Sequence, residues 1–182
     1  MSKAVIFFAP GLEECEGLVT VDLLRRAGVE VQICAVSNDR TIVGAHGIRI
    51  VCDALASDAD RTADAVILPG GIPGTPNLAA SRTVCDLVRE FDASGRLVAA
   101  ICAAPTVLGG LGLLEGRRAT CYPGCEDGLG GAAYIDAETV RDGNIITGSG
   151  LGAAIPFALE IIAYLEGPDV AEMKRKSIVY RH

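Results

Sequence analysis

Tryptophan is absent from this 182-residue sequence, and phenylalanine and tyrosine occur only four times each, although half of the residues are hydrophobic. The core must therefore be built mainly from aliphatic side chains. Together with 22 glycines, this composition is typical of a mostly parallel β-sheet with helices on both faces. The length suits a single domain over residues 1–182.

Basic charge and long apolar runs are also scarce. The formal net charge is −7, which gives no electrostatic footprint for nucleic acid or for an anionic membrane. The N-terminal apolar run is short and has no small-residue cleavage site, and no segment approaches the roughly 20 apolar residues of a membrane span. We therefore expect a cytoplasmic protein with no nucleic-acid partner and no membrane partner.

Histidine occurs only at positions 46 and 182, and the seven cysteines are scattered along the chain. An odd number of dispersed thiols does not indicate a disulfide framework. Cys121 and Cys125 are the only close pair, and no second pair supplies the remaining ligands of a structural zinc site. We expect no metal and no cofactor.

The hydrophobic pattern alternates between strands and helices. Leu18, Val21, Leu23 and Leu24 are expected on the buried face of the first helix, and 72–76 is expected to be a loop. The predicted elements are buried strands at 3–9, 29–36, 63–68 and 97–101, a hairpin or short edge excursion at 41–51, a hairpin at 140–147, short strands at 117–122 and 132–135, and helices at 13–26, 81–92, 105–112, 153–165 and around 173–176. This order indicates a doubly wound α/β sandwich.

Three loops follow buried strands of the predicted sheet, at residues 10–16, 69–74 and 102–105. The carboxyl ends of parallel strands meet at one edge, where open sheets of this kind bind ligands. The sequence therefore predicts a site at this edge.

Cys102 lies between a buried strand and a helix whose first turn contains Pro105. Free N–H groups and the helix dipole there would lower the pKa of the thiol, whereas the alternative is a buried cysteine that only packs. Glu16, in the first turn of the first helix, can point toward the sulfur. A protonated Glu16 would donate a hydrogen bond to the thiolate, and an ionised one would raise the thiol pKa. The alternative for Glu16 is an acid that only complements the helix dipole.

The Gly70-Gly71 pair permits close approach of the backbone. The N–H groups of Gly71 and Ala103 are therefore candidates for an oxyanion hole beside Cys102, although the pair also fits a plain loop.

The combination of Pro10-Gly11-Leu-Glu-Glu-Cys-Glu16, Val-Ile-Leu-Pro69-Gly70-Gly71 and Val-Ala-Ala-Ile-Cys102-Ala-Ala-Pro105 resembles the DJ-one/ThiJ/PfpI superfamily. The likeness is to the branch of the parkinsonism-associated deglycase and its bacterial relatives, and it covers essentially the whole chain. It implies a flavodoxin-like (Rossmann-like) three-layer α/β/α sandwich, a homodimer, and a nucleophile elbow with strained backbone at Cys102. It also implies an acidic partner at Glu16 and an oxyanion hole at Gly71 and Ala103.

The sequence departs from the superfamily pattern at two positions. Protease-like members have a histidine after the cysteine, where this chain has Ala103, so we do not expect a Cys-His peptidase. The deglycase branch often has a histidine where this chain has Tyr122, and tyrosine is a poor general base at neutral pH. Tyr122 and Gly70 are expected to shape the pocket. His46 either approaches the site, within the chain or across a dimer interface, or belongs to a solvent-facing turn.

Two functions use the same atoms. In the first, which the resemblance implies, the protein is a glutathione-independent glyoxalase or deglycase, in which Cys102 attacks a small reactive aldehyde such as methylglyoxal and Glu16 moves protons. In the second, Cys102 senses peroxide by oxidation to sulfenic or sulfinic acid, with Cys15, Cys121 or Cys125 as a resolving thiol. A thiol hydratase or an amidase is a third possibility. The expected partner is thus a small carbonyl compound or a peroxide.

Overall fold

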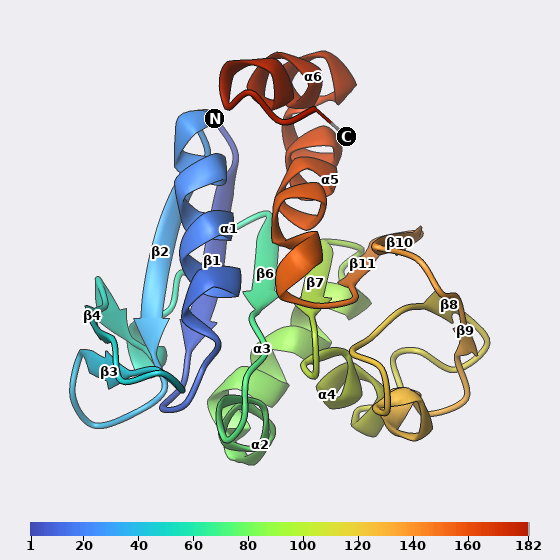
Figure 1. Cartoon of the computed structure of the whole chain (residues 1–182). Helices are drawn as coiled ribbons and strands as arrows, with labels where there is room; N and C mark the ends of the chain where they lie inside the picture. The colour runs from blue at the N-terminus through green and yellow to red at the C-terminus, as the bar shows by residue number, and fades with distance from the viewer. Residues whose placement is uncertain (182) are drawn as a thin grey trace.

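The computed structural model describes residues 1–181, so His182 lies outside the described part of the chain. A seven-stranded sheet forms the centre of the molecule (Figure 1). Its strands are β1 (Lys3–Phe8), β2 (Glu30–Ala35), β5 (Ala54–Leu55), β6 (Ala65–Leu68), β7 (Leu97–Ile101), β10 (Thr139–Asp142) and β11 (Ile145–Gly148). Their order is β10-β11-β7-β6-β1-β2-β5, and every neighbouring pair is parallel except β10 with β11.

Helices cover both faces of this sheet (Figure 1). They are α1 (Glu14–Arg26), α2 (Gly74–Ala80), α3 (Arg82–Ala93), α4 (Pro105–Gly110), α5 (Ala154–Glu166) and α6 (Pro168–Ser177). Side chains of α1 and α5 share one core cluster with one face of the strands, and side chains of α2, α3 and α4 share a second cluster with the other face. This arrangement confirms the predicted flavodoxin-like three-layer α/β/α sandwich.

Smaller elements surround the main sheet. They are the antiparallel pair β3 (Thr41–Val43) and β4 (Arg49–Val51), the parallel pair β8 (Arg118–Ala119) and β9 (Ala133–Tyr134), and the 3-10 helices η1 (Ala56–Asp58), η2 (Glu126–Leu129) and η3 (Leu151–Ala153). The hairpins predicted at 41–51 and 140–147 are confirmed.

Local sequence explains where the helices begin. Glu13 ends the loop after β1 and accepts a hydrogen bond from the Glu16 N–H at 2.7 Å, which caps α1. Ser81 caps α3 in the same way through the Val84 N–H at 3.4 Å. These caps fix the ends of the helices beside the carboxyl ends of the strands.

Three details of the sequence prediction are wrong. Residues 72–76 are not all loop, because α2 begins at Gly74, and β5 was not expected at all. Leu18 is 39% exposed instead of buried, because it lies on the outer side of α1.

No helix in residues 1–181 is long and apolar enough to cross a membrane.

The strand order places a crevice at one edge of the sheet. The chain passes from β1 to β2 on one side and later returns to β6 and β7 on the other side. The connections diverge at the carboxyl ends of β1 and β6, which is where open α/β sheets bind ligands. The loops after β1, β6 and β7 therefore meet at this edge (Figure 1), as the sequence predicts.

Candidate active site

Cys102 follows β7 with φ of 65°, a left-handed conformation that costs a non-glycine residue roughly 1–2 kcal/mol. Two backbone hydrogen bonds hold it there. Its N–H donates to the Gly148 carbonyl at 2.9 Å, and its carbonyl accepts from the Tyr122 N–H at 2.8 Å. Pro105 then starts α4. This strained turn between strand and helix has the backbone geometry of the nucleophile elbow that the resemblance implies.

Glu16 and Cys102 meet across Gly70. The Glu16 side chain is buried, and its Oε2 accepts from the Gly70 N–H at 2.9 Å. A Cβ atom placed on Gly70 would lie 2.6 Å from Cys102 Cβ and 2.8 Å from Glu16 Oε2. The absence of a side chain at Gly70 therefore allows the thiol and the carboxyl to share one space. Glu16 is thus more than an acid that complements the helix dipole.

Burial raises the pKa of Glu16 to about 7, against the opposing effects of its hydrogen bonds with the Cys102 thiol and the Gly70 N–H. Glu16 Oε1 is buried and has no nitrogen or oxygen partner in the described chain. The thiol is therefore the remaining polar neighbour of this carboxyl. A protonated Glu16 can direct its O–H toward the sulfur.

The pKa of Cys102 is raised to about 12, first by burial and then by the charge and hydrogen bonding of Glu16. The expected lowering of the thiol pKa is therefore wrong. The helix that follows Cys102, α4, has only six residues, so its amides stabilise the thiolate weakly. The Glu16 carboxylate opposes their effect on the thiol pKa. When the proton resides on Glu16, the repulsion disappears, so the two groups titrate as a pair.

Two backbone N–H groups, from Ala103 and Gly71, face the sulfur and favour the ionised form of Cys102. Gly71 has φ of 95°, and a Cβ there would overlap the backbone of Leu12 and Glu13. The structure thus brings together the four residues expected to form the reacting centre: Cys102, Glu16, Gly71 and Ala103.

Tyr122 lies next to this centre through its backbone hydrogen bond to Cys102. Its side chain is 53% exposed and lines a cavity of about 640 Å³. The cavity is also lined by Tyr134 and Asp136, which the sequence analysis did not identify, because only the fold brings 134–136 beside Tyr122. Cys102, Glu16 and Gly70 are not among the residues that line this cavity, so a role of Tyr122 in the pocket of Cys102 stays a prediction.

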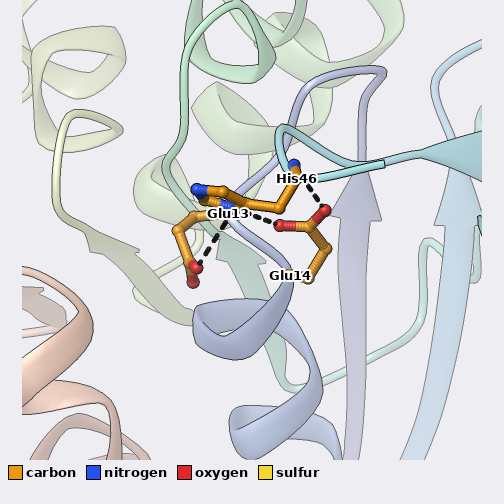
Figure 2. A group of neighbouring side chains, drawn as sticks. All are labelled: Glu13, Glu14 and His46. Atoms are coloured by element: carbon orange, nitrogen blue, oxygen red, sulfur yellow. Dashed lines mark hydrogen bonds and ion pairs between the residues drawn. The ribbon is translucent and has the colours of Figure 1, made fainter. Parts of the chain in front are cut away.

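His46 lies on the loop between β3 and β4, and its side chain is 70% exposed. Its Nδ1 is 2.9 Å from Glu14 Oε2 and 4.0 Å from Glu13 Oε1 (Figure 2). Burial raises the pKa of Glu14, but hydrogen bonds from His46 and from the Ile48 N–H outweigh it and lower the pKa overall. The hydrogen bond and charge of Glu14 raise the pKa of His46.

Glu13, Glu14 and His46 are also the group of described residues whose ligand atoms lie close enough to hold a metal ion, all within 4.8 Å of one another. One oxygen of each carboxylate is already hydrogen-bonded to a backbone N–H. The sequence analysis missed Glu14, because the contact depends on how the hairpin packs against α1.

The three cysteines proposed as resolving thiols differ in exposure. Cys15 is exposed on α1, Cys125 is half-buried, and Cys121 is buried at the wall of the cavity beside Tyr122. All seven cysteines are free thiols.

The sequence matches the model of the DJ-1/PfpI family over residues 2–164. It is 39% identical to Protein dj-1beta of Drosophila melanogaster over 98% of both chains. It is also 39% identical to the glutathione-independent glyoxalase DJR-1.2 of Caenorhabditis elegans, over 92% of this chain and 90% of that protein. The crystal structure of a mutant of the DJ-1 superfamily protein STM1931 from Salmonella typhimurium superposes on the whole chain with a TM-score of 0.95 at 39% identity, covering all of that chain. Since the family model and these relatives extend over most of the sequence, the chain belongs to the DJ-1/PfpI family.

Proposed function

We propose that this protein is a cysteine-dependent, glutathione-independent glyoxalase that converts small reactive aldehydes of the methylglyoxal type to hydroxy acids. The observation that carries the proposal is the contact of the Cys102 thiol with a buried Glu16 whose pKa is raised to about 7. A carboxyl with a pKa near neutrality can both give and take a proton. The 39% identity to the Caenorhabditis elegans glyoxalase supports the same reaction class.

In the first step, the proton shared by the pair is on Glu16, and the Cys102 thiolate attacks the aldehyde carbon to form a carbon–sulfur bond. The carbonyl oxygen gains the electron pair and is stabilised by the N–H groups of Gly71 and Ala103, which face the sulfur. This oxygen takes up the proton held by Glu16, which gives a thiohemiacetal and a Glu16 carboxylate.

In the second step, the Glu16 carboxylate removes the proton from the carbon bonded to sulfur and returns it to the neighbouring carbon, and the hydroxyl proton of the first carbon moves to the oxygen of the second. This transfer produces the thioester of a 2-hydroxy acid, and no external oxidant is needed because one carbon is oxidised as the other is reduced. Water then cleaves the carbon–sulfur bond, which releases the hydroxy acid and regenerates the thiol. Aldehyde and water are consumed in equal amounts.

The test is lactate formation from methylglyoxal by the purified protein, compared with Cys102→Ala and Glu16→Gln. We expect Cys102→Ala to form no lactate from methylglyoxal. The rate of lactate formation should fall about 10²- to 10⁴-fold in Glu16→Gln, which is the usual contribution of one acid–base group. Equal lactate production by wild type and Cys102→Ala would refute the proposal.

Peroxide sensing at Cys102 is a second candidate function. Cys102 is partly exposed and has two amide donors for a charged sulfur, whereas Cys34, Cys52 and Cys121 are buried. Peptide mass spectrometry after mild peroxide should then find oxidation concentrated at Cys102. Equal modification of all seven cysteines would contradict a sensor role.

We further propose that the protein acts as a cytoplasmic homodimer. Seven free cysteines suit a reducing compartment. An apolar face on α1 and α5, including Leu18, Val19 and Ile155, surrounds a hollow of about 500 Å³. Such a face suits contact with a second copy of the chain.

A further inference from the structure

Thr147 is a buried polar residue in the otherwise apolar strand β11. Its side chain is 1% exposed, and it follows Ile145 and Ile146. A buried hydroxyl costs free energy unless it is hydrogen-bonded. Thr147 Oγ1 donates to the Val140 carbonyl at 3.4 Å and accepts from the Thr120 N–H at 2.9 Å. Packing in a strand would be served equally well by valine, so the hydroxyl points to a role in hydrogen bonding.

The N–H of Thr120 depends on this hydroxyl. Thr120 follows β8 and is completely buried, and its own hydroxyl donates to the Ala137 carbonyl at 3.1 Å. The acceptor for its N–H is Thr147 Oγ1, 27 positions away along the chain. A buried N–H without an acceptor destabilises the conformation that buries it, so loss of the Thr147 hydroxyl would displace this segment.

The same segment is joined to Cys102 two residues later. The Tyr122 N–H donates to the Cys102 carbonyl at 2.8 Å, and the Cys102 N–H donates to the Gly148 carbonyl at 2.9 Å. Because β11 lies beside β7 (Figure 1), both backbone groups of Cys102 are connected to two consecutive residues of β11. The connection to Gly148 is direct, and the connection to Thr147 passes through residues 120–122.

These three hydrogen bonds form a ring around the backbone of Cys102. A non-glycine residue keeps a φ of 65° only when its surroundings hold it there. The direction of the Cα–Cβ bond depends on the backbone conformation. A relaxed Cys102 would therefore turn its sulfur away from Glu16 and from the N–H groups of Gly71 and Ala103.

We propose that Thr147 is a positioning residue for the nucleophile: its hydroxyl fixes residues 120–122, which in turn hold Cys102 in the left-handed conformation. This inference rests on the proposed function, because Cys102 is the nucleophile of that reaction. If Thr147 served only to stabilise the sheet, its loss would lower the melting temperature and leave the chemistry of Cys102 unchanged.

The test compares two changes at this position in the full-length protein. Thr147→Val removes the hydroxyl and keeps the branched shape, whereas Thr147→Ser keeps the hydroxyl; Thr147→Ala takes the place of Thr147→Val if the latter does not fold. Ile145→Val is the matched control. Ile145 is 1% exposed on the same face of the same strand, and its change removes one methyl group but no hydrogen bond. Melting temperatures of all variants are measured first, so that effects at Cys102 are compared at similar stability.

The first measurement is alkylation of each cysteine by iodoacetamide over a range of pH, followed by peptide mass spectrometry. Burial and Glu16, the titratable group that faces Cys102, raise the pKa of this thiol well above the ordinary value of about 8.5. In Thr147→Val the midpoint of Cys102 alkylation should fall toward that value by about one pH unit or more, because the thiol leaves its buried position. Thr147→Ser and Ile145→Val should keep the wild-type midpoint. Cys15, which is exposed on α1, is the internal standard and should react at the same rate in every variant.

The second measurement is kcat and KM for lactate formation from methylglyoxal. We expect kcat of Thr147→Val to fall about 10- to 100-fold with little change in KM, because a displacement of about 1 Å in a reacting group can cost this much. Thr147→Ser should recover most of the wild-type kcat.

A wild-type alkylation midpoint in Thr147→Val would overturn the positioning role, and the glyoxalase proposal would stand as long as wild type makes lactate. An equal shift in Ile145→Val would also overturn it, since a general loss of stability would then explain the effect. A midpoint that shifts in Thr147→Val and returns in Thr147→Ser, in a protein that makes no lactate, would support the positioning role and reject the proposed reaction.

Discussion

Replacement of Glu16 by glutamine should change how the stability of the protein depends on pH. Glutamine has nearly the same shape and can still accept the Gly70 N–H, but it carries no titratable proton. The variant therefore removes the ionisation of this buried carboxyl and leaves the packing around Gly70 in place.

The sign and size of the effect follow from the raised pKa of Glu16. Between its ordinary value of 4.5 and about 7, the folded state keeps the proton that the unfolded state releases. Wild-type stability therefore falls as the pH rises through this window, and the contribution is constant above it. A difference of about 2.5 pH units, at about 1.36 kcal/mol per unit, corresponds to roughly 3 kcal/mol.

Urea unfolding of both proteins between about pH 4.5 and about pH 8 measures this effect. The stability of Glu16→Gln relative to wild type should rise by roughly 3 kcal/mol across the range, which is about 6–12 °C in melting temperature for a chain of this size. Glu115→Gln, an exposed change, is the control. A difference between Glu16→Gln and wild type that stays constant with pH would refute the raised pKa and the shared proton.

Three further predictions concern packing, backbone strain and assembly. Gly70→Ala should destabilise the fold by about 1–3 kcal/mol and abolish turnover, because the added Cβ would lie between Cys102 and Glu16. Gly110→Ala, which has open space around it, should be neutral or slightly stabilising, and equal melting temperatures of the two variants would contradict the close packing at Gly70. Cys102→Gly should be more stable than Cys102→Ala by roughly 1 kcal/mol, because only glycine relieves the positive φ, and the reverse order in urea unfolding would argue against strain at this residue. Light scattering should find a dimer that Leu18→Glu converts to monomers, and a dimer unaffected by this change would exclude the α1 face as the interface.

The sequence predicted the fold well where local pattern and topology agree. Buried strands such as 97–101, bounded by turn residues, imply a parallel sheet whose loops meet at one edge. The positions of Cys102 and Glu16 follow from that arrangement, since each lies just beyond a strand or in the first turn of the next helix. The positive φ at Cys102 was implied by the resemblance to known proteins, because the local sequence gives no sign of it.

The remaining features depend on contacts between distant parts of the chain. The thiol pKa of Cys102 was predicted to be lowered, but it is raised, because burial and the charge of Glu16 outweigh the amides of a six-residue helix. The contact between Glu14 and His46 joins residues 32 positions apart and requires the hairpin to lie against α1. The exposure of Leu18 could not be inferred either, because leucine at helical spacing is usually buried.

The two ends of the central sheet affect how the protein behaves at high concentration. At one end β5 has only two residues, and at the other β10 carries Arg141 and Asp142, with the Arg141 guanidinium over the Tyr164 ring at 4.6 Å. Short and charged outer strands offer poor templates for the backbone of another molecule. Both edges of the sheet therefore resist pairing with a second sheet, so concentrated protein is not expected to grow by strand addition at either end.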